Sequence, residues 1–220
     1  MDYLITILIR LPVVLIAITL HEFAHGFVAY KMGDYTAKYM GRLSLNPIKH
    51  IDVIGAISML LFGLGWAKPI PVDARRFKRP KLGMALTALA GPVMNVLLGI
   101  ISCFICTAIE VNASFTEKNF GYYMAYAAVT FFYNMSMLNF GLALFNLIPI
   151  PPLDGSRIFL SWLPEESYFS VMKYERFIAL GFILLLLVDS RLLGGNINYG
   201  LSYVISHVFD FFYSIFARIF

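Results

Sequence analysis

Charged residues are scarce in this sequence. Asp, Glu, Lys and Arg make up 14% of the 220 residues, whereas hydrophobic residues make up 60%, and the mean hydropathy is +0.76. A soluble domain carries about one quarter charged residues and about one half apolar ones. The composition therefore excludes an ordinary soluble fold. We expect a multi-pass protein of the cell membrane, with residues 1–220 forming a single membrane-embedded domain.

Acidic residues are slightly fewer than basic ones, which gives a net charge of +4 from 13 acidic and 17 basic side chains. In a membrane protein such an excess reports topology, because Lys and Arg gather on the cytoplasmic side. We therefore expect no nucleic-acid partner, and we expect the lipid bilayer to be the main environment.

Cysteine is nearly absent. Cys103 and Cys106 have C-x-x-C spacing, but they lie inside an apolar run rather than beside a βαβ unit. This context argues against a redox pair or a zinc site. We expect both to be small core residues.

Long apolar runs predict an all-α polytopic membrane protein with about five spanning helices. The sequence also lacks the basic start and small-residue cleavage site of a secretory signal, so the first run is expected to remain as a span. The predicted spans are residues 3–31, 82–109, 121–148, 168–188 and 198–217.

Residues 40–70 break this pattern. The apolar stretch from Ile51 to Trp66 is short and is interrupted by three glycines, Gly55, Gly63 and Gly65. This predicts a re-entrant or strand-like segment inserted into the membrane, which is tolerated where protein or a wet cavity surrounds it. Basic residues flank the segment on both sides, so we expect both flanks on the cytoplasmic side. These are Lys31, Lys38, Arg42 and Lys49 before it, and Lys68, Arg75, Arg76, Lys78, Arg79 and Lys81 after it.

The sequence His21-Glu22-Phe23-Ala24-His25, at the end of the first run, is an H-E-x-x-H motif. Residues four apart share one helix face, so both imidazoles can reach one Zn²⁺. Glu22 is offset by one residue and is the candidate general base for a water molecule beside the metal. The alternative is a polar cluster where the helix leaves the membrane. Ionisable residues at membrane depth are costly and usually functional, which favours the metal site.

A zinc hydrolase of this kind needs a third protein ligand. Asp154 is favoured because it follows the span ending at Pro149, which places it on the same membrane face as His21 and His25. The prolines before it and Gly155 after it indicate a non-helical, rigid backbone. The alternative for Asp154 is a simple turn or helix N-cap. The other candidates are Asp34, His50, Asp52, Asp73, His207 and Asp210.

Three segments resemble the site-2 protease family of zinc intramembrane proteases. They are Leu20 to Gly26, Ala90 to Asn95 (similar to the G-P-x-x-N helix of that family) and Phe145 to Arg157. The resemblance implies one zinc ion per chain, Asp154 as the third ligand and Asn146 as a polar group near the substrate carbonyl. It also implies cleavage of transmembrane substrates, usually in regulated proteolysis. We expect no PDZ-like or CBS domain of the kind that some relatives carry, and the sequence resembles a minimal prokaryotic member.

Three further polar residues have two interpretations each. Asn95 lies within a predicted span, where its amide either orients the motif helix or joins helices together with Gly91 and Gly99. His50 either acts behind the ligands or near the substrate entrance, or is an interfacial residue without a chemical role. His207 is expected to be a packing residue.

The sequence therefore predicts a membrane-embedded metalloprotease domain with its active site near the cytoplasmic side. Its expected partner is a substrate membrane helix, and the sequence leaves open whether a regulatory partner acts on it. One alternative is a catalytically silent, zinc-binding membrane scaffold, against which Glu22 argues because a structural zinc site needs no base. Another is a metal transporter, which would spread its polar residues over several spans.

Overall fold

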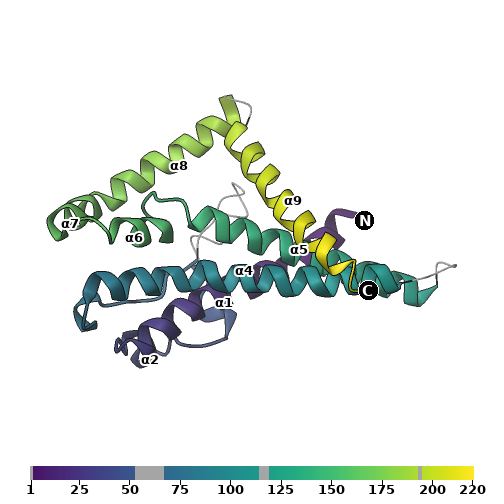
Figure 1. Cartoon of the computed structure of the whole chain (residues 1–220), viewed down its shortest axis with the longest axis horizontal. Coiled ribbons are helices and arrows are strands. Elements are labelled where there is room, and N and C mark those ends of the chain that lie inside the picture. The colour runs from purple at the N-terminus through teal and green to yellow at the C-terminus, as the bar shows by residue number, and fades with distance from the viewer. Residues whose placement is uncertain (1, 53–66, 114–118, 193–194) are drawn as a thin grey trace. The chain divides into compact units, whose positions relative to one another are not determined.

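The computed structural model describes residues 2–52, 67–113, 119–192 and 195–220. Within these residues the chain is helical and no strand is present, which confirms the predicted all-α class. Figure 1 shows the succession of helices. In chain order they are α1 (Asp2–Lys31), α2 (Thr36–Tyr39), η1 (Pro47–Lys49), η2 (Ala74–Arg76), α4 (Pro80–Asn112), α5 (Phe120–Asn146), α6 (Asp154–Leu160), α7 (Glu165–Lys173), α8 (Glu175–Leu192) and α9 (Asn196–Phe216).

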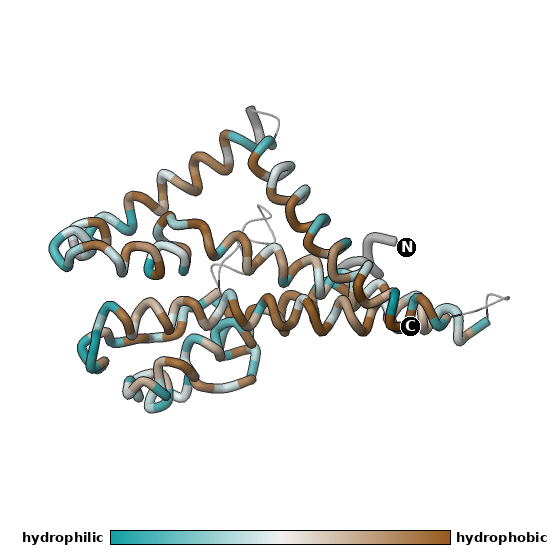
Figure 2. Tube along the Cα trace, in the orientation of Figure 1, coloured by the Kyte–Doolittle hydropathy of each residue, from teal (hydrophilic) through white to brown (hydrophobic). Residues whose placement is uncertain are grey.

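Among the described residues, three helices are long and apolar enough to cross a membrane: Leu8–Lys31, Pro80–Asn112 and Phe120–Asn146. Hydrophobic residues follow one another along much of α4, and hydrophilic ones gather where it begins (Figure 2). The chain is therefore a helical membrane protein. Helices α8 and α9 are not among these three. Four charged residues lie within the 18 residues of α8, so its composition is less clearly that of a span.

The run predicted as one span over residues 168–188 is divided in two. α7 ends at Lys173 and α8 begins at Glu175, with Tyr174 between them at φ −98° and ψ 9°. α7 has acidic residues in its first turn and a basic residue in its last, so it is polar rather than membrane-like. Apolar composition alone could not show this turn.

The apolar part of the predicted inserted segment (residues 40–70), from Ile51 to Trp66, falls mostly on residues 53–66, which lie outside the described residues. Its two ends are described. Ile51 and Ala67 form an isolated antiparallel bridge, and the Lys68 amide donates to the His50 carbonyl at 2.9 Å. Ile51 and Ala67, which lie on either side of residues 53–66 in the sequence, are therefore next to each other in space.

The helices belong to two compact units. The first comprises residues 1–17, 95–145 and 186–220. Its core is a buried cluster of Cys103, Phe140 and Phe209. α4 approaches α5 closely here, because a Cβ on Gly99 would lie 2.6 Å from the Phe140 ring. Cys103 and Cys106 are both buried and free, as expected for core residues.

The second unit comprises residues 18–94 and 146–185. It contains the end of α1, α2, the start of α4, α6 and α7. A cluster of Ala29, Phe77 and Met84 packs the end of α1 against the segment that leads into α4. The H-E-x-x-H motif and Asp154 both lie in this unit. The prediction of a single domain over residues 1–220 stays a prediction.

Candidate metal centre

The two histidines of the motif lie one turn apart near the C-terminal end of α1, a helix of 30 residues. The run from Val13 to Phe23 is apolar apart from Thr19, His21 and Glu22, and so favours an uninterrupted helix at membrane depth. The four-residue spacing brings the imidazoles to one face, where their ring centroids are 4.5 Å apart. His21 is 9% exposed and His25 is 7% exposed, so the pair is buried.

A break between two helices delivers Asp154. α5 ends at Asn146, and the proline-containing turn that follows leads into α6, whose first residue is Asp154. Gly155 allows this turn to close, because a Cβ at that position would lie 2.3 Å from the Leu147 carbonyl oxygen. That obstacle is backbone and could not rotate away. The tight turn therefore requires glycine after Asp154. The same turn directs the Asp154 side chain toward α1.

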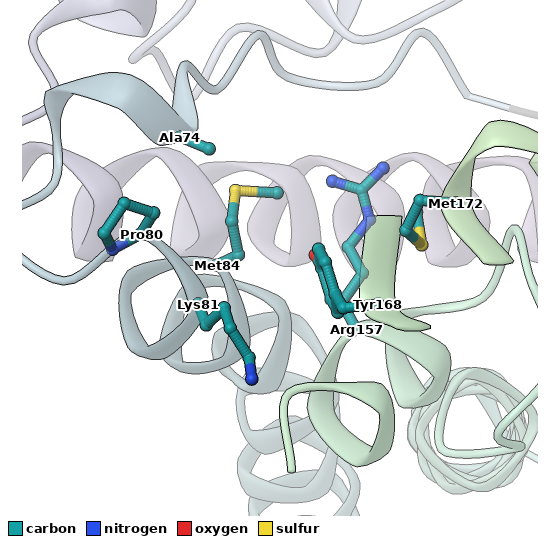
Figure 3. Close-up of a pocket in the computed structure, with 7 residues that line it drawn as sticks. All are labelled: Ala74, Pro80, Lys81, Met84, Arg157, Tyr168 and Met172. Carbon is teal, nitrogen blue, oxygen red and sulfur yellow. The ribbon is translucent and has the colours of Figure 1, made fainter. Parts of the chain in front are cut away.

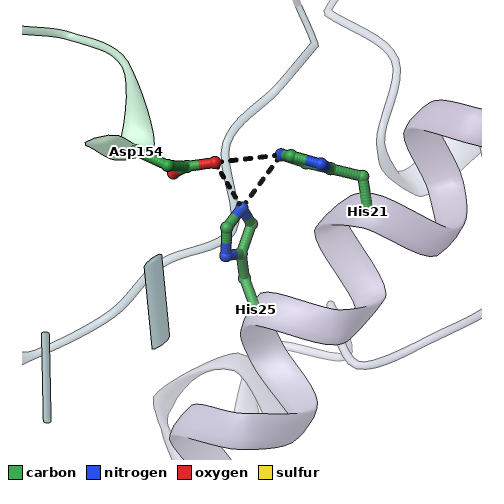
Figure 4. Close-up of side chains that lie close together, drawn as sticks. All are labelled: His21, His25 and Asp154. Carbon is green, nitrogen blue, oxygen red and sulfur yellow. Dashed lines mark hydrogen bonds and ion pairs between the residues drawn. The ribbon is translucent and has the colours of Figure 1, made fainter. Parts of the chain in front are cut away.

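The three side chains converge, as Figure 4 shows. The Nε2 atoms of His21 and His25 are 3.0 Å apart, and each lies 3.3 Å from Oδ2 of Asp154. Three ligands at 2.0–2.1 Å from a tetrahedral zinc ion would be separated by about 3.3 Å from one another. The His–His–Asp group (His21, His25 and Asp154) thus has the spacing and the donor types of a three-ligand zinc site with a fourth position open.

Hydrogen bonding behind the ligands fixes one imidazole. Nδ1 of His25 lies 2.7 Å from the Thr87 carbonyl oxygen in α4. A carbonyl only accepts, so Nδ1 carries the proton, and the neutral ring then offers its Nε2 lone pair to a metal. This is the tautomer that a zinc ligand requires.

The carboxylate of Asp154 is also suited to a cation. Oδ2 is buried and makes no hydrogen bond within the described part of the chain. Burial raises the pKa of this carboxyl, but its contacts with His21 and His25 outweigh that effect and hold the pKa below its usual range. An anionic oxygen without a hydrogen bond, facing two imidazole nitrogens, is an arrangement that a bound cation would satisfy.

Glu22 points to a different partner. Its side chain is buried, and Oε2 accepts a 2.8 Å hydrogen bond from the Ile70 amide. Ile70 is 48 residues away, in the extended segment that leads toward η2. The carboxylate adjacent to the His–His–Asp group is therefore held by a backbone donor.

The other predicted residues are placed as follows. Asn146 is half-buried at the end of α5, eight residues before Asp154. Asn95 is fully buried and donates to Asn139 at 2.9 Å, which joins α4 to α5. His50 is fully buried and hydrogen-bonds the Ser44 carbonyl at 2.7 Å. His207 is exposed on α9 and bonds the Tyr203 carbonyl of its own helix.

Two acidic candidates for the third ligand have other contacts. Asp34 is buried and accepts hydrogen bonds from Thr36 and from the Asp73 amide. Asp73 pairs with Arg75, which lowers the pKa of Asp73 to about 2. The Asp34 carboxylate joins the end of α1 to the segment before α4, whereas the Asp73 carboxylate pairs within that segment, and neither belongs to the His–His–Asp group.

A cavity of about 170 Å³ lies elsewhere in the same unit (Figure 3). It is lined by Ala74, Pro80, Lys81, Met84, Arg157, Tyr168 and Met172. None of these residues belongs to the His–His–Asp group. This cavity is therefore separate from the His–His–Asp group.

Sequence reasoning missed three contacts at the site: the Thr87 carbonyl, the Ile70 amide and the glycine Gly91. A Cβ on Gly91 would lie 2.5 Å from ring atoms of both His21 and His25. The glycine of the G-P-x-x-N segment indicates close approach, but the sequence does not show that α4 approaches the two histidines themselves.

We expect Gly91→Ala to lower zinc affinity by about ten- to a hundredfold, the range seen when groups supporting metal ligands are altered. The added methyl would displace the imidazoles. Competition with a chelator, followed by metal analysis, measures this. Gly181→Ala in α8 is the matched control, because a Cβ there meets nothing within 4 Å. Both changes favour the helix in themselves, so equal zinc affinity in the two variants would contradict the prediction.

Proteins similar to this chain carry the names of zinc metalloproteases. The model of peptidase family M50 matches residues 10–188. A Bacillus subtilis (strain 168) protein named "Putative zinc metalloprotease YwhC" is 41% identical over 201 residues, which cover 90% of this chain and 84% of that protein. "Putative zinc metalloprotease Rip2" of Mycobacterium tuberculosis (strain H37Rv) is 27% identical, covering 82% of this chain and 66% of that protein.

A further relative is "Zinc metalloprotease MJ0392" of Methanocaldococcus jannaschii, which is 28% identical over 69% of this chain and 33% of its own length. No solved structure gives a significant match. The family match covers most of the chain, including the motif helix, the start of α4 and the Asp154 turn. The chain therefore belongs to peptidase family M50, the site-2 protease family of membrane zinc metalloproteases.

Proposed function

We propose that this protein is an intramembrane zinc metalloprotease that hydrolyses peptide bonds in transmembrane segments of other proteins, in regulated intramembrane proteolysis. Its substrate partner is a membrane-spanning helix presented within the lipid bilayer. The observation that carries the proposal is the convergence of Asp154, from α6, with His21 and His25, which lie beside Glu22 on a helix apolar enough to cross a membrane. A structural zinc site would need no carboxylate such as Glu22 next to its ligands.

We assign His21, His25 and Asp154 as the three protein ligands of one zinc ion. When bound, that ion supplies a Lewis acid that polarises water and the peptide carbonyl. Glu22 accepts a proton from the attacking water and returns it to the leaving nitrogen. Asn146 donates a side-chain hydrogen bond to the carbonyl oxygen as negative charge develops on it.

We further propose five spanning segments, a re-entrant segment within residues 40–70 and an active site near the cytoplasmic side of the cell membrane. The bridge between Ile51 and Ala67 supports the re-entrant path, because both ends of the segment then lie on one side. Basic residues flank it on both sides, as expected for cytoplasmic loops. α8 and α9 would supply the two additional spans.

Comparative proteomics of membrane fractions tests the function. Cells carrying the wild-type protein and cells carrying Glu22→Gln should differ in a small set of membrane proteins. Those proteins should accumulate uncleaved in the variant and yield shorter fragments with the wild type. Identical membrane proteomes under conditions of full expression would contradict a protease function.

The role of Asn146 makes a separate prediction. Asn146→Ala should retain zinc and substrate KM but lower kcat by about two to three orders of magnitude, because a donor to a developing oxyanion is worth about 2.7–4 kcal/mol in the transition state. Asn146→Asp should be no better, since a carboxylate repels that oxyanion. Steady-state cleavage of a casein substrate in detergent micelles measures both constants.

Asn134→Ala is the matched control for Asn146→Ala. It lies in the same helix, and its amide bonds the Thr130 carbonyl of its own turn. If Asn146 only caps the end of α5, its loss of activity should follow its loss of thermal stability. An Asn146→Ala protein that melts like the wild type and turns over normally would show that the transition-state role is wrong.

A further inference from the structure

The hydrogen bond between Glu22 and Ile70 comes from an unusual stretch of backbone. Ile70 stands between Pro69 and Pro71, neither of which has an amide hydrogen. The Ile70 amide is therefore the single backbone donor among these three residues, and it is directed at Oε2 of Glu22 at 2.8 Å. A proline also restricts the residue before it to extended conformations, so Lys68 and Ile70 are both stiffened.

The side chain of Ile70 keeps the segment against α1. It is 9% exposed, and its Cδ1 atom occupies the space beside Gly26, where a Cβ would lie 2.3 Å away. Gly26 is one turn beyond Glu22 on α1. The segment is thus packed on the helix at the same level as the carboxylate that it binds.

Arg42 contacts the same segment from the other side. Its guanidinium donates to the Lys68 carbonyl at 2.7 Å and to the Pro69 carbonyl at 3.3 Å. The Pro69 carbonyl and the Ile70 amide belong to one peptide group. That peptide group therefore accepts from a cation at its oxygen and donates to an anion at its nitrogen, and each interaction polarises the other.

Two further contacts fix Arg42 and the segment. The Arg42 amide donates to the carbonyl of Ala37 in α2 at 2.8 Å, and the Lys68 amide donates to the His50 carbonyl at 2.9 Å. The position of the peptide is therefore set by α2 and by the loop that carries His50, not by the motif helix alone.

We propose that Arg42 is a positioning residue for the general base. It holds the Pro69–Ile70 peptide so that the Ile70 amide binds Oε2 of Glu22 and directs Oε1 toward the reacting water. The inference rests on the proposed protease function for its kinetic consequence, whereas the hydrogen-bonded chain from Arg42 to Glu22 can be tested without catalysis. Arg42 affects only the orientation of the Glu22 carboxylate. Its substitution should therefore lower kcat more than it changes KM.

The kinetic test compares Arg42→Gln and Arg42→Lys with the wild type on casein in detergent micelles. Arg42→Gln should lower kcat about 10- to 100-fold, as expected for loss of a hydrogen-bonded contact to a charged group, with KM, zinc content and melting temperature retained. Arg42→Lys should recover part of this loss, because its ammonium can still donate to one of the two carbonyls. Arg75→Gln is the control for the charge change, since Arg75 is exposed and pairs with Asp73.

Hydrogen–deuterium exchange provides the readout that does not depend on activity. In a peptide covering residues 67–72, the amides of Lys68 and Ile70 should exchange slowly in the wild type. Glu22→Ala should release one amide, that of Ile70, and Arg42→Gln should release the same amide while Lys68 remains protected.

Unchanged exchange at Ile70 in Glu22→Ala would overturn the inference while leaving a protease function intact. Arg42→Gln with wild-type kcat would overturn it as well, and so would a loss of kcat accompanied by equal losses of zinc, melting temperature and protection at every amide of the peptide. If no variant and no wild-type protein cleaves any substrate but the exchange pattern is as expected, the proposed function fails and the hydrogen-bonded chain stands.

Discussion

Glu22→Gln is expected to bind zinc at the wild-type stoichiometry and to lose peptide-bond hydrolysis. The amide has the size of the carboxylate, and its oxygen can still accept the hydrogen bond from the Ile70 amide. The geometry around α1 is therefore preserved, while the group that takes the proton from water is removed. General bases contribute about 10²- to 10⁴-fold, so kcat should fall by at least this range.

The measurement pairs metal analysis of purified protein with steady-state cleavage of casein in detergent micelles. Glu166→Gln is the control, because Glu166 is an exposed carboxylate in the first turn of α7. It should retain both zinc and activity. Substantial hydrolysis by Glu22→Gln would remove Glu22 from the role of base. A wild-type protein that binds zinc and cleaves nothing would favour the scaffold interpretation instead.

The helices that carry the site were predictable because their sequence signals are local. The apolar runs 3–31, 82–109 and 121–148 correspond closely to α1, α4 and α5, since long apolar runs leave the backbone no alternative to a helix at membrane depth. The division at Tyr174 was not predictable in the same way, because a single turn between two helices changes hydropathy very little.

The residues of the His–His–Asp group differ in how well the sequence predicts their positions. The four-residue spacing of His21 and His25 determines their convergence within one helix. Asp154 was selected by membrane side and by the rigid turn around it, and the structure places its Oδ2 3.3 Å from both imidazole nitrogens. The sequence therefore favours Asp154 among the acidic candidates, and the structure places it beside both histidines, while its role as a ligand stays a prediction.

The contacts behind the site could not be predicted, because they are made by backbone atoms that carry no residue signature. The Thr87 carbonyl and the Ile70 amide would be present with any side chain at those positions. The prolines on each side of Ile70 are the one sequence feature that indicates this contact, because they leave Ile70 as the single backbone donor of the three residues. Arg42 acts through two carbonyls, so its identity alone did not point to Glu22.

Asp154→Ala is expected to have the largest effect on the metal. Altering groups that merely support metal ligands costs about 10- to 100-fold in affinity, so removal of one of three protein ligands should cost more than about 100-fold. Alanine leaves the turn at Gly155 intact, because that turn depends on the close approach to the Leu147 carbonyl and not on the carboxylate. The change is therefore directed at zinc rather than at the fold of α6.

Two measurements separate loss of a ligand from loss of structure in Asp154→Ala. Zinc content after purification should fall to a small fraction of one ion per chain. A chelator should lower the melting temperature of the wild type, since a metal that binds only the folded state stabilises it, and should leave that of Asp154→Ala unchanged. Asp210→Ala, at an exposed position on α9, is the control and should behave like the wild type in both measurements. Full zinc occupancy in Asp154→Ala would exclude Asp154 as the third ligand and would make Asp52, at the end of the described part of that loop, the next residue to substitute.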